Sequence, residues 1–229
     1  MNSSKPLVSV RALRRTWTRR SWLPPRTVTV TGLDGVDLDI APRSIVGLVG
    51  RSGSGKSTLA RCISGMERPT GGQIRSLPYN RLQLIPQDPG ASLNARYSVL
   101  DTVGEPLMIS GAPRDMRRVR SQECLEMTGL SDCAAASSPD QLSGGQRARL
   151  ALARALAALE FDSGPGLLIL DESLSNLDLS TQAQMLNLLL ALRQRHDLAI
   201  LLISHELAVV RYVSDTVLEM SEGKLVTLC

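Results

Sequence analysis

A glycine-rich segment near the start of the chain carries the residues that a phosphate-binding loop needs. Residues 50–57 read GRSGSGKS, which fits the pattern GxxxxGK[ST]. The glycines let successive backbone N–H groups curl around phosphate oxygens, and the next helix contributes the positive end of its dipole. A Gly/Ser-rich turn with a chance lysine is the plainer interpretation, but the segment lies between a predicted strand and a predicted helix, as the motif requires. The segment therefore predicts a nucleoside triphosphate site.

Two side chains of this loop have distinct expected roles. Lys56 would reach the outer phosphates, and the Ser57 hydroxyl would ligate Mg²⁺. The expected nucleotide-binding residues of the loop are Gly50, Arg51, Ser52, Gly53, Ser54, Gly55, Lys56, Ser57 and Thr58.

Two adjacent acids, Asp171 and Glu172, follow the apolar run Leu167–Leu170. Carboxylates at the end of a buried strand are costly unless they bind a cation or a proton in transit. We expect Asp171 to hold Mg²⁺ through water and Glu172 to act as the general base toward an attacking water. An Asp-Glu pair is ordinarily a solvated strand end or a helix cap, but the phosphate loop in the same chain favours the catalytic interpretation.

The sequence LSGGQ at residues 142–146 precedes a strongly helical stretch from Arg147 to Ala158. A serine and two glycines at the start of a helix predict a second anion-binding helix N-terminus. SGG alone is a common loop. Together with the two motifs above, the sequence resembles the signature of ATP-binding cassette (ABC) ATPases, and this resemblance covers nearly the whole chain. The signature residues, which would contact ATP held by a second subunit, are Leu142, Ser143, Gly144, Gly145 and Gln146.

The resemblance to ABC ATPases implies roles for four more residues. Gln87 matches the Q-loop glutamine, which in the family touches Mg²⁺ and the attacking water, and Asp178 matches the D-loop that couples two nucleotide sites. His205 matches the switch histidine that contacts the γ-phosphate. Trp17 falls where the family places an aromatic that stacks on adenine, although Trp22 is a near neighbour and either could be ordinary hairpin packing.

The segment QDPGASLN at residues 87–94 is more specific than a bare Q-loop, because it resembles the branch of ABC proteins that import oligopeptides, dipeptides and nickel. Some features depart from that branch: Ala95 and Ser173 stand where proline is usual, and the segment Leu159–Gly166 is longer and more polar. The chain also ends at Cys229, without the C-terminal extension typical of that branch. None of these departures touches a catalytic group, but they suggest a divergent member, such as a component of a metal–metallophore importer.

Short apolar runs alternate with helical stretches along the chain, which predicts an α/β fold. The resemblance specifies a P-loop NTPase with a RecA-like core, an N-terminal antiparallel β region and a helical signature subdomain. We expect a single ABC ATPase domain over residues 1–229, with the core at 1–90 and 155–229 and the helical subdomain at 91–154. The expected strands are Val8–Val10, Thr27–Ile40, Ile45–Val49, Leu82–Ile85, Leu167–Leu170 and Ala199–Ile203, with helices from the glycine loop to about Met66 and at Thr181–Arg195, and a terminal hairpin of Val217–Met220 and Lys224–Leu228.

Composition narrows the functional classes. The 229 residues are 43% hydrophobic and 21% charged, which excludes a disordered chain. A net charge of +4 and 3% aromatic residues do not match a dedicated nucleic-acid binder. The N-terminus has no secretory signal, the apolar runs are too short to cross a bilayer, and the four cysteines lack metal-site spacing, so we expect reduced thiols.

The resemblance implies that two such chains, or this chain and a paralogue, sandwich two ATP molecules with Mg²⁺. The predicted function is ATP hydrolysis that powers solute uptake of the peptide, nickel or metal-chelate class. The expected partners are membrane permease subunits, a second ABC ATPase and a solute-binding protein, and the expected location is the cytoplasmic face of the plasma membrane. The alternatives are an exporter ATPase and a non-transport ABC ATPase acting on nucleic acid or ribosomes.

Overall fold

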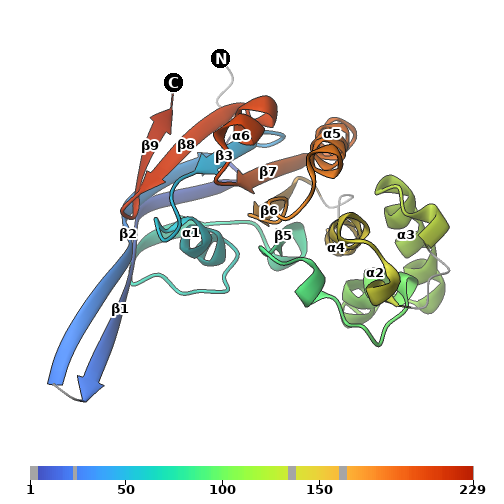
Figure 1. Cartoon of the computed structure of the whole chain (residues 1–229), viewed down its shortest axis with the longest axis horizontal. Coiled ribbons are helices and arrows are strands. Elements are labelled where there is room, and N and C mark those ends of the chain that lie inside the picture. Colours follow the sequence, from blue (N-terminus) through green and yellow to red (C-terminus); the bar gives the residue numbers. More distant parts are fainter. Residues whose placement is uncertain (1–4, 23–24, 134–137, 160–163, 229) are drawn as a thin grey trace.

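The computed structural model describes residues 5–22, 25–133, 138–159 and 164–228. A six-stranded sheet in the order β5-β6-β7-β3-β8-β9 forms the centre of the molecule (Figure 1). Its first five strands in this order run parallel and β9 is antiparallel to β8. The strands are β3 (Ile45–Val49), β5 (Leu82–Ile85), β6 (Gly166–Asp171), β7 (Leu198–Ile203), β8 (Thr216–Ser221) and β9 (Lys224–Leu228).

The central strands are buried on both faces, as continuous apolar runs predict for a parallel sheet. Every residue of β3, β6 and β7 is buried. Successive residues of β6 alternate between two apolar clusters: Leu168 and Leu170 pack with the helices α4 and α5, whereas Leu167 and Ile169 pack with α1 and the N-terminal strands. The sheet therefore separates two layers of core and holds the chain segments that leave its edge.

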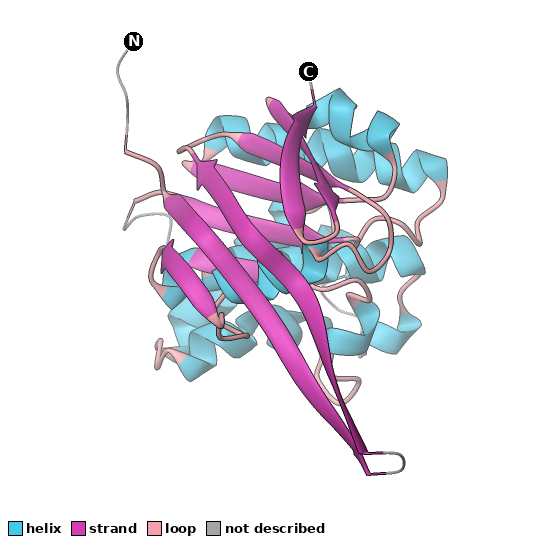
Figure 2. Cartoon of the chain, turned by 90° about the vertical axis from the view of Figure 1, so that its left-hand side faces the viewer, coloured by secondary structure: helices cyan, strands magenta, loops and turns pink. Residues whose placement is uncertain are grey.

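The N-terminal antiparallel β region is confirmed, and it is larger than the sequence pattern predicts. β1 (Val8–Trp22) pairs with β2 (Pro25–Ile40) and with β4 (Gly71–Arg75) in a second sheet of order β2-β1-β4. The predicted strand ends at Val10 because the following residues lack an alternating apolar pattern; backbone pairing with β2 extends it. The far part of the β1–β2 hairpin projects beyond the rest of the molecule (Figure 2).

The helices agree with the prediction in position and differ at some ends. Helix α1 ends at Ile63 rather than near Met66, because Ser64 caps it and Gly65 adopts a φ of 77°. The α-helices are α1 (Lys56–Ile63), α2 (Val99–Ile109), α3 (Arg114–Met127), α4 (Gly144–Ala158), α5 (Leu179–Arg195) and α6 (Leu207–Val213), and the short 3₁₀ turns are η1 (Tyr79–Arg81), η2 (Gly90–Ser92), η3 (Ser131–Cys133) and η4 (Pro139–Gln141).

Helices α2, α3 and α4 pack on one another beside the β5 edge of the central sheet (Figure 1). α4 also contacts β5 and continues without a break from Gly144 to Ala158. One helix thus belongs to both parts of the molecule, and the division at residue 154 stays a prediction. Residues 160–163 of the polar segment expected at Leu159–Gly166 lie outside the described residues.

The last two strands form the predicted terminal hairpin around Glu222 and Gly223, which have φ values of 49° and 77°. Within the part of the chain that the structure describes, no helix is both long enough and apolar enough to cross a membrane.

Candidate functional site

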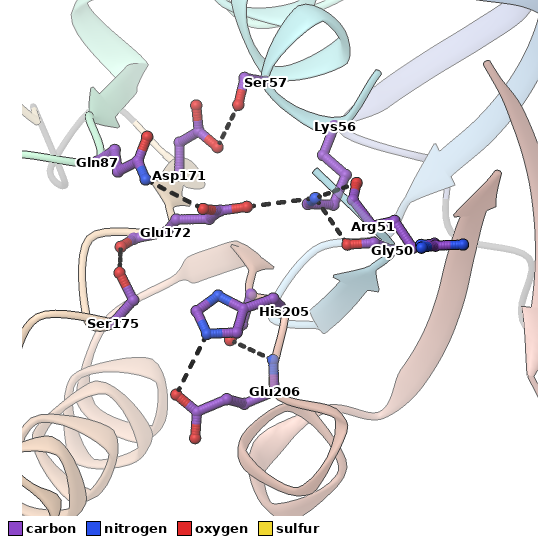
Figure 3. Close-up of polar contacts among 11 residues, drawn as sticks. Gly50, Arg51, Lys56, Ser57, Gln87, Asp171, Glu172, Ser175, His205 and Glu206 are labelled. Carbon is purple, nitrogen blue, oxygen red and sulfur yellow. Dashed lines mark hydrogen bonds and ion pairs between the residues drawn. The ribbon is translucent and has the colours of Figure 1, made fainter. Parts of the chain in front are cut away.

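The parallel strands bring the predicted catalytic segments to one edge of the central sheet. The phosphate loop leaves the carboxyl end of β3, Asp171 ends β6, and His205 follows β7. Since these strands are neighbours in the sheet, their carboxyl ends meet at the same edge. Figure 3 shows the side chains that meet there.

The phosphate loop needs glycine where the backbone passes close to other segments. A Cβ on Gly50 would lie 2.3 Å from the carbonyl oxygen of Met220, and one on Gly55 would lie 2.3 Å from that of Gly32. Both residues also have left-handed φ values, 152° and 113°, which favour glycine. The buried Ser54 hydroxyl has no hydrogen-bond partner among the described residues. The loop is therefore a tight cradle with a free polar group, suited to an oxygen-rich ligand.

Lys56 is buried inside this cradle, with 4% of its surface exposed. Its Nζ donates hydrogen bonds to the carbonyl oxygens of Gly50 and Arg51, at 2.8 and 3.1 Å. Nζ also lies 3.2 Å from Oε1 of Glu172 (Figure 3). The structure therefore pairs the loop lysine directly with the predicted general base, a contact that the sequence motifs do not predict.

Asp171 and Ser57 meet across the site. The Ser57 hydroxyl donates a hydrogen bond of 2.9 Å to Oδ1 of Asp171, which is 5% exposed. Burial raises the pKa of Asp171 above its ordinary value, and the hydrogen bond from Ser57 partly offsets this. A buried carboxylate beside a hydroxyl offers the oxygen ligands that Mg²⁺ prefers.

Glu172 is held from several sides. The Nε2 of Gln87 donates to its Oε2 at 3.2 Å, opposite the contact with Lys56. The backbone of Glu172 has a φ of 51°, a left-handed conformation that is unusual for a residue other than glycine. Its backbone N–H donates a hydrogen bond to the carbonyl oxygen of Ile203. The predicted Q-loop and the two catalytic motifs therefore converge on one carboxylate.

His205 lies at the same sheet edge, but within the described residues none of its hydrogen bonds or ion pairs reaches that carboxylate cluster. Its ring is more than half exposed, and its Nε2 lies 3.9 Å from Oε1 of Glu206 (Figure 3). The contact with a γ-phosphate stays a prediction.

Trp17 lies near the residue that follows the phosphate loop, Thr58. A Cβ on Gly32 would meet its ring at 2.5 Å and the methyl group of Thr58 at 3.5 Å, so the ring and Thr58 flank the same point. The indole Nε1 donates to Glu67 at 3.0 Å, and the Arg15 guanidinium lies 5.0 Å from the ring centre. The side chain of Trp22 is outside the described residues, and adenine stacking on Trp17 stays a prediction.

The signature residues form the start of α4. Ser143 is the N-cap: its hydroxyl accepts from the backbone N–H of Gln146, whose side chain accepts from the backbone N–H of Ser143, in a capping box. Sequence reasoning missed Cys133, whose Sγ accepts from Nε2 of Gln146 at 3.5 Å. Gln146 of the signature therefore connects the N-terminus of α4 both to Ser143 and to Cys133.

The predicted D-loop residue is tied to the signature through one threonine. Asp178 caps α5 by accepting from the backbone N–H of Thr181 at 3.0 Å and from its hydroxyl at 2.7 Å. The methyl group of Thr181 lies 2.6 Å from where a Cβ on Gly145 would stand. The sequence spacing gives no sign of this contact, because it joins segments more than thirty residues apart.

Comparison with known proteins agrees with the geometry. Residues 33–175 match the family of ABC transporters. The chain is 42% identical to the probable D,D-dipeptide transport ATP-binding protein DdpF of Escherichia coli over 92% of its length, and 39% identical to the oligopeptide transport ATP-binding protein OppF of Lactococcus lactis over 87%. It spans 67% and 66% of these relatives, about two thirds of their length.

Solved structures show the same fold. The dimeric bacterial ABC transporter cassette MJ0796 superposes with a TM-score of 0.81 at 25% identity, covering 95% of this chain and 96% of that one. A post-hydrolysis state of MJ0796 bound to ADP and Pi superposes with a TM-score of 0.80 at 26% identity, covering 97% and 99%. The predicted P-loop NTPase fold is confirmed, and the chain belongs to the ABC transporter family as an ATPase whose relatives include the ATP-binding proteins of peptide importers.

Proposed function

We propose that this chain is the ATP-hydrolysing subunit of a transporter that takes up a solute of the peptide, nickel or metal-chelate class through a membrane permease. The observation that carries the proposal is the convergence of Lys56, Ser57, Gln87, Asp171 and Glu172 at one edge of the sheet. The 42% identity to a dipeptide transport ATP-binding protein supports the class of solute, and relatives named as putative peptide import ATP-binding proteins, 39% identical, support the direction of transport.

ATP binding begins with an exchange of partners at Lys56. The ammonium group now lies 3.2 Å from Glu172 and is shielded from water. Phosphate oxygens carry more negative charge than one carboxylate, and the backbone N–H groups of the loop add donors. We expect Lys56 to turn to the outer phosphates and Trp17 to stack on the adenine, which leaves Glu172 free to accept a proton.

The residues present fit Mg²⁺. Ser57 and Asp171 supply a hydroxyl and a carboxylate 2.9 Å apart, and Gln87 can add an amide oxygen. When bound, Mg²⁺ neutralises charge on the transferred phosphoryl group. Ionised Asp171 is disfavoured by its burial, which makes a cation partner favourable at this position.

Glu172 is the group placed to activate water. Gln87, hydrogen-bonded to its Oε2, would orient the water, and Glu172 would take the proton as the water attacks the γ-phosphate. The exposed His205 would contact the same phosphate once the nucleotide and a second subunit enclose it.

A second ABC ATPase completes the site. The signature of each subunit, Leu142–Gln146, would close over the ATP held by the phosphate loop of the other, and Asp178 would link the two sites. The dimeric arrangement of the similar cassette MJ0796 supports this assembly. The partner is a second copy or a related ATPase.

A groove between β5, α2 and α4 is the proposed contact site for the permease. It has a volume of about 510 Å³ and is lined largely by apolar side chains, among them Leu84, Leu107, Ile109 and Ala155. We expect the segment Gln87–Tyr97 around the Q-loop to contact the permease, and Ser92 of this segment lies in the wall of the groove. The permease would hold the chain at the cytoplasmic face of the membrane, and a solute-binding protein would deliver the cargo.

The test is to purify the tagged Glu172→Gln chain from its native host in mild detergent with ATP, and to identify its stoichiometric partners. The matched control omits ATP. A multi-span permease with a solute-binding protein supports uptake, and a second ATPase shows a heterodimer. A permease with ATP-dependent efflux in inside-out vesicles would favour an exporter, and ribosomes or DNA-repair proteins without a permease would overturn the proposal.

A further inference from the structure

One arginine of the signature helix joins three separate segments. Nη1 of Arg154 donates a hydrogen bond of 2.9 Å to the carbonyl oxygen of Ser92, in the turn η2. Its Nη2 lies 2.6 Å from Oε2 of Glu105 on α2. The same guanidinium therefore ties α4 to the segment after the Q-loop and to α2.

This contact suits arginine in particular. The side chains of Arg154 and Glu105 are 30% and 22% exposed, so their attraction is only partly screened by water. The planar guanidinium offers several donors in a fixed fork and can satisfy a carbonyl and a carboxylate at once. Lysine would keep the charge but not this geometry.

The tied turn is short and internally bonded, so its position fixes that of Gln87. Oδ1 of Asp88 accepts from the backbone N–H of Ala91 at 3.0 Å, and the Ser92 hydroxyl donates to the carbonyl of Pro89 at 2.6 Å. Gln87 directly precedes this turn and donates to Glu172. A displacement at Ser92 therefore moves Gln87 relative to the general base.

Arg154 also faces the groove proposed for the permease. Among the described residues that line the groove, it is the only one that carries a charge. It lies on α4, whose first residues form the signature. The C-terminal half of α4 thus lines the groove, whereas its N-terminus belongs to the interface expected with a second subunit.

We propose that Arg154 is a positioning residue, which holds the turn after the Q-loop where Gln87 reaches Glu172. This inference rests on the proposed ATPase function and deepens it. Arg154 touches none of the reacting groups, so its effect acts through Gln87.

The experiment compares steady-state ATP hydrolysis by the full chain carrying Arg154→Ala, Arg154→Lys or Glu105→Gln. The control is Arg11→Ala, which removes an exposed ion pair with Asp39 far from the site. We expect Arg154→Ala to lower kcat about tenfold, since misplacement of a catalytic group by about 1 Å can cost that much or more. The Kd for ATP should change less than about twofold because the phosphate loop is untouched. The kcat values of Arg154→Lys and Glu105→Gln should lie between those of the wild-type chain and Arg154→Ala.

A double-mutant cycle separates positioning from general stability. If Arg154 acts through Gln87, Arg154→Ala lowers kcat in the wild-type background but not in Gln87→Ala. An equal loss in both backgrounds, or a kcat equal to that of Arg11→Ala, would overturn the inference. If Arg154→Ala does not fold, as judged by its Kd for ATP, Arg154→Lys serves in the same cycle. Absence of ATP hydrolysis by the wild-type chain, both alone and together with the ATPase that co-purifies with it, would instead reject the proposed function.

Discussion

Lys56 and Glu172 face each other across the phosphate cradle, and each is surrounded by groups that constrain it. The lysine has two carbonyl acceptors and one carboxylate, and the glutamate has one amide donor and one ammonium. At the scale of single residues, the chemistry therefore depends on which partner Lys56 takes when phosphate is present.

Replacing Lys56 by alanine removes the only ammonium group that the described loop places in the cradle. A charge-assisted hydrogen bond contributes roughly 1.5–3 kcal/mol, so the affinity for ATP should fall about 10- to 100-fold. Calorimetric titration of ATP measures this loss, with Lys224→Ala, an exposed lysine on β9, as the control. Undiminished affinity would reject the assignment of the cradle.

Replacing Glu172 by glutamine keeps the shape of the side chain and removes the base. We expect ATP binding to persist and kcat to fall at least about a hundredfold, the usual contribution of a general base. Steady-state and single-turnover hydrolysis measure the change, beside Glu123→Gln on the exposed face of α3. Turnover close to that of the unmodified chain would move the role of base to His205 or to another group.

Helix α5 shows that a residue expected to couple two sites also has a structural task. The carboxylate of Asp178 caps this helix, and its bonds to the N–H and hydroxyl groups of Thr181 lower the pKa of Asp178. A carboxyl with a lowered pKa in the folded state stabilises the fold above its unfolded pKa. That stability is lost as the pH falls through the folded pKa.

The cap gives a prediction at the scale of the element. Asp178→Ala should lower the melting temperature at neutral pH, and this difference from the unmodified chain should shrink as the pH falls below about 4. Asp178→Asn keeps a capping oxygen and should lose less. Thermal melts followed by circular dichroism over this pH range test the idea; a difference independent of pH would show that the charge of Asp178 does not contribute.

Elements were predictable where burial dictates their pattern. The sequence predicts β3 and β5 with the bounds that the structure has, because β3 is buried along its whole length and β5 buries Leu82 and Ile85 at its two ends. It does not predict β4, a strand with no buried residue, whose pairing with β1 depends on backbone hydrogen bonds rather than on side-chain type.

At the scale of the whole molecule, the phosphate loop and the signature lie on different elements, α1 and α4, and one chain supplies one of each. The proposed function joins the loop of one subunit to the signature of another. The exposed Ser143 is the point at which this assembly can be blocked without touching the loop.

An arginine at Ser143 should prevent closure of two subunits while leaving ATP binding to the single chain intact. The bulky cation would occupy the space where the signature meets the partner's nucleotide. Light scattering in the Glu172→Gln background, with and without ATP and Mg²⁺, measures the dimer; Ser138→Arg, before the signature, is the nearby control. An ATP-dependent dimer that survives Ser143→Arg would reject the sandwich.

The sequence by itself determined the local motifs that carry the chemistry of the site. The motifs around Lys56, Asp171 and Ser143 are contiguous, so spacing alone identifies a phosphate loop, a carboxylate pair after a buried strand, and a capped helix start. Their physical basis is local: glycine where the backbone turns left-handed, and apolar runs where strands are buried.

Contacts between distant segments were decided only by the tertiary structure. The pairing of Lys56 with Glu172, the packing of Thr181 against Gly145, and the tie from Arg154 to Ser92 each join residues at least 36 positions apart. No spacing rule relates such residues. Their distance depends on the order of strands in the sheet and on how the helices pack beside it, because the whole chain must fold before these side chains meet.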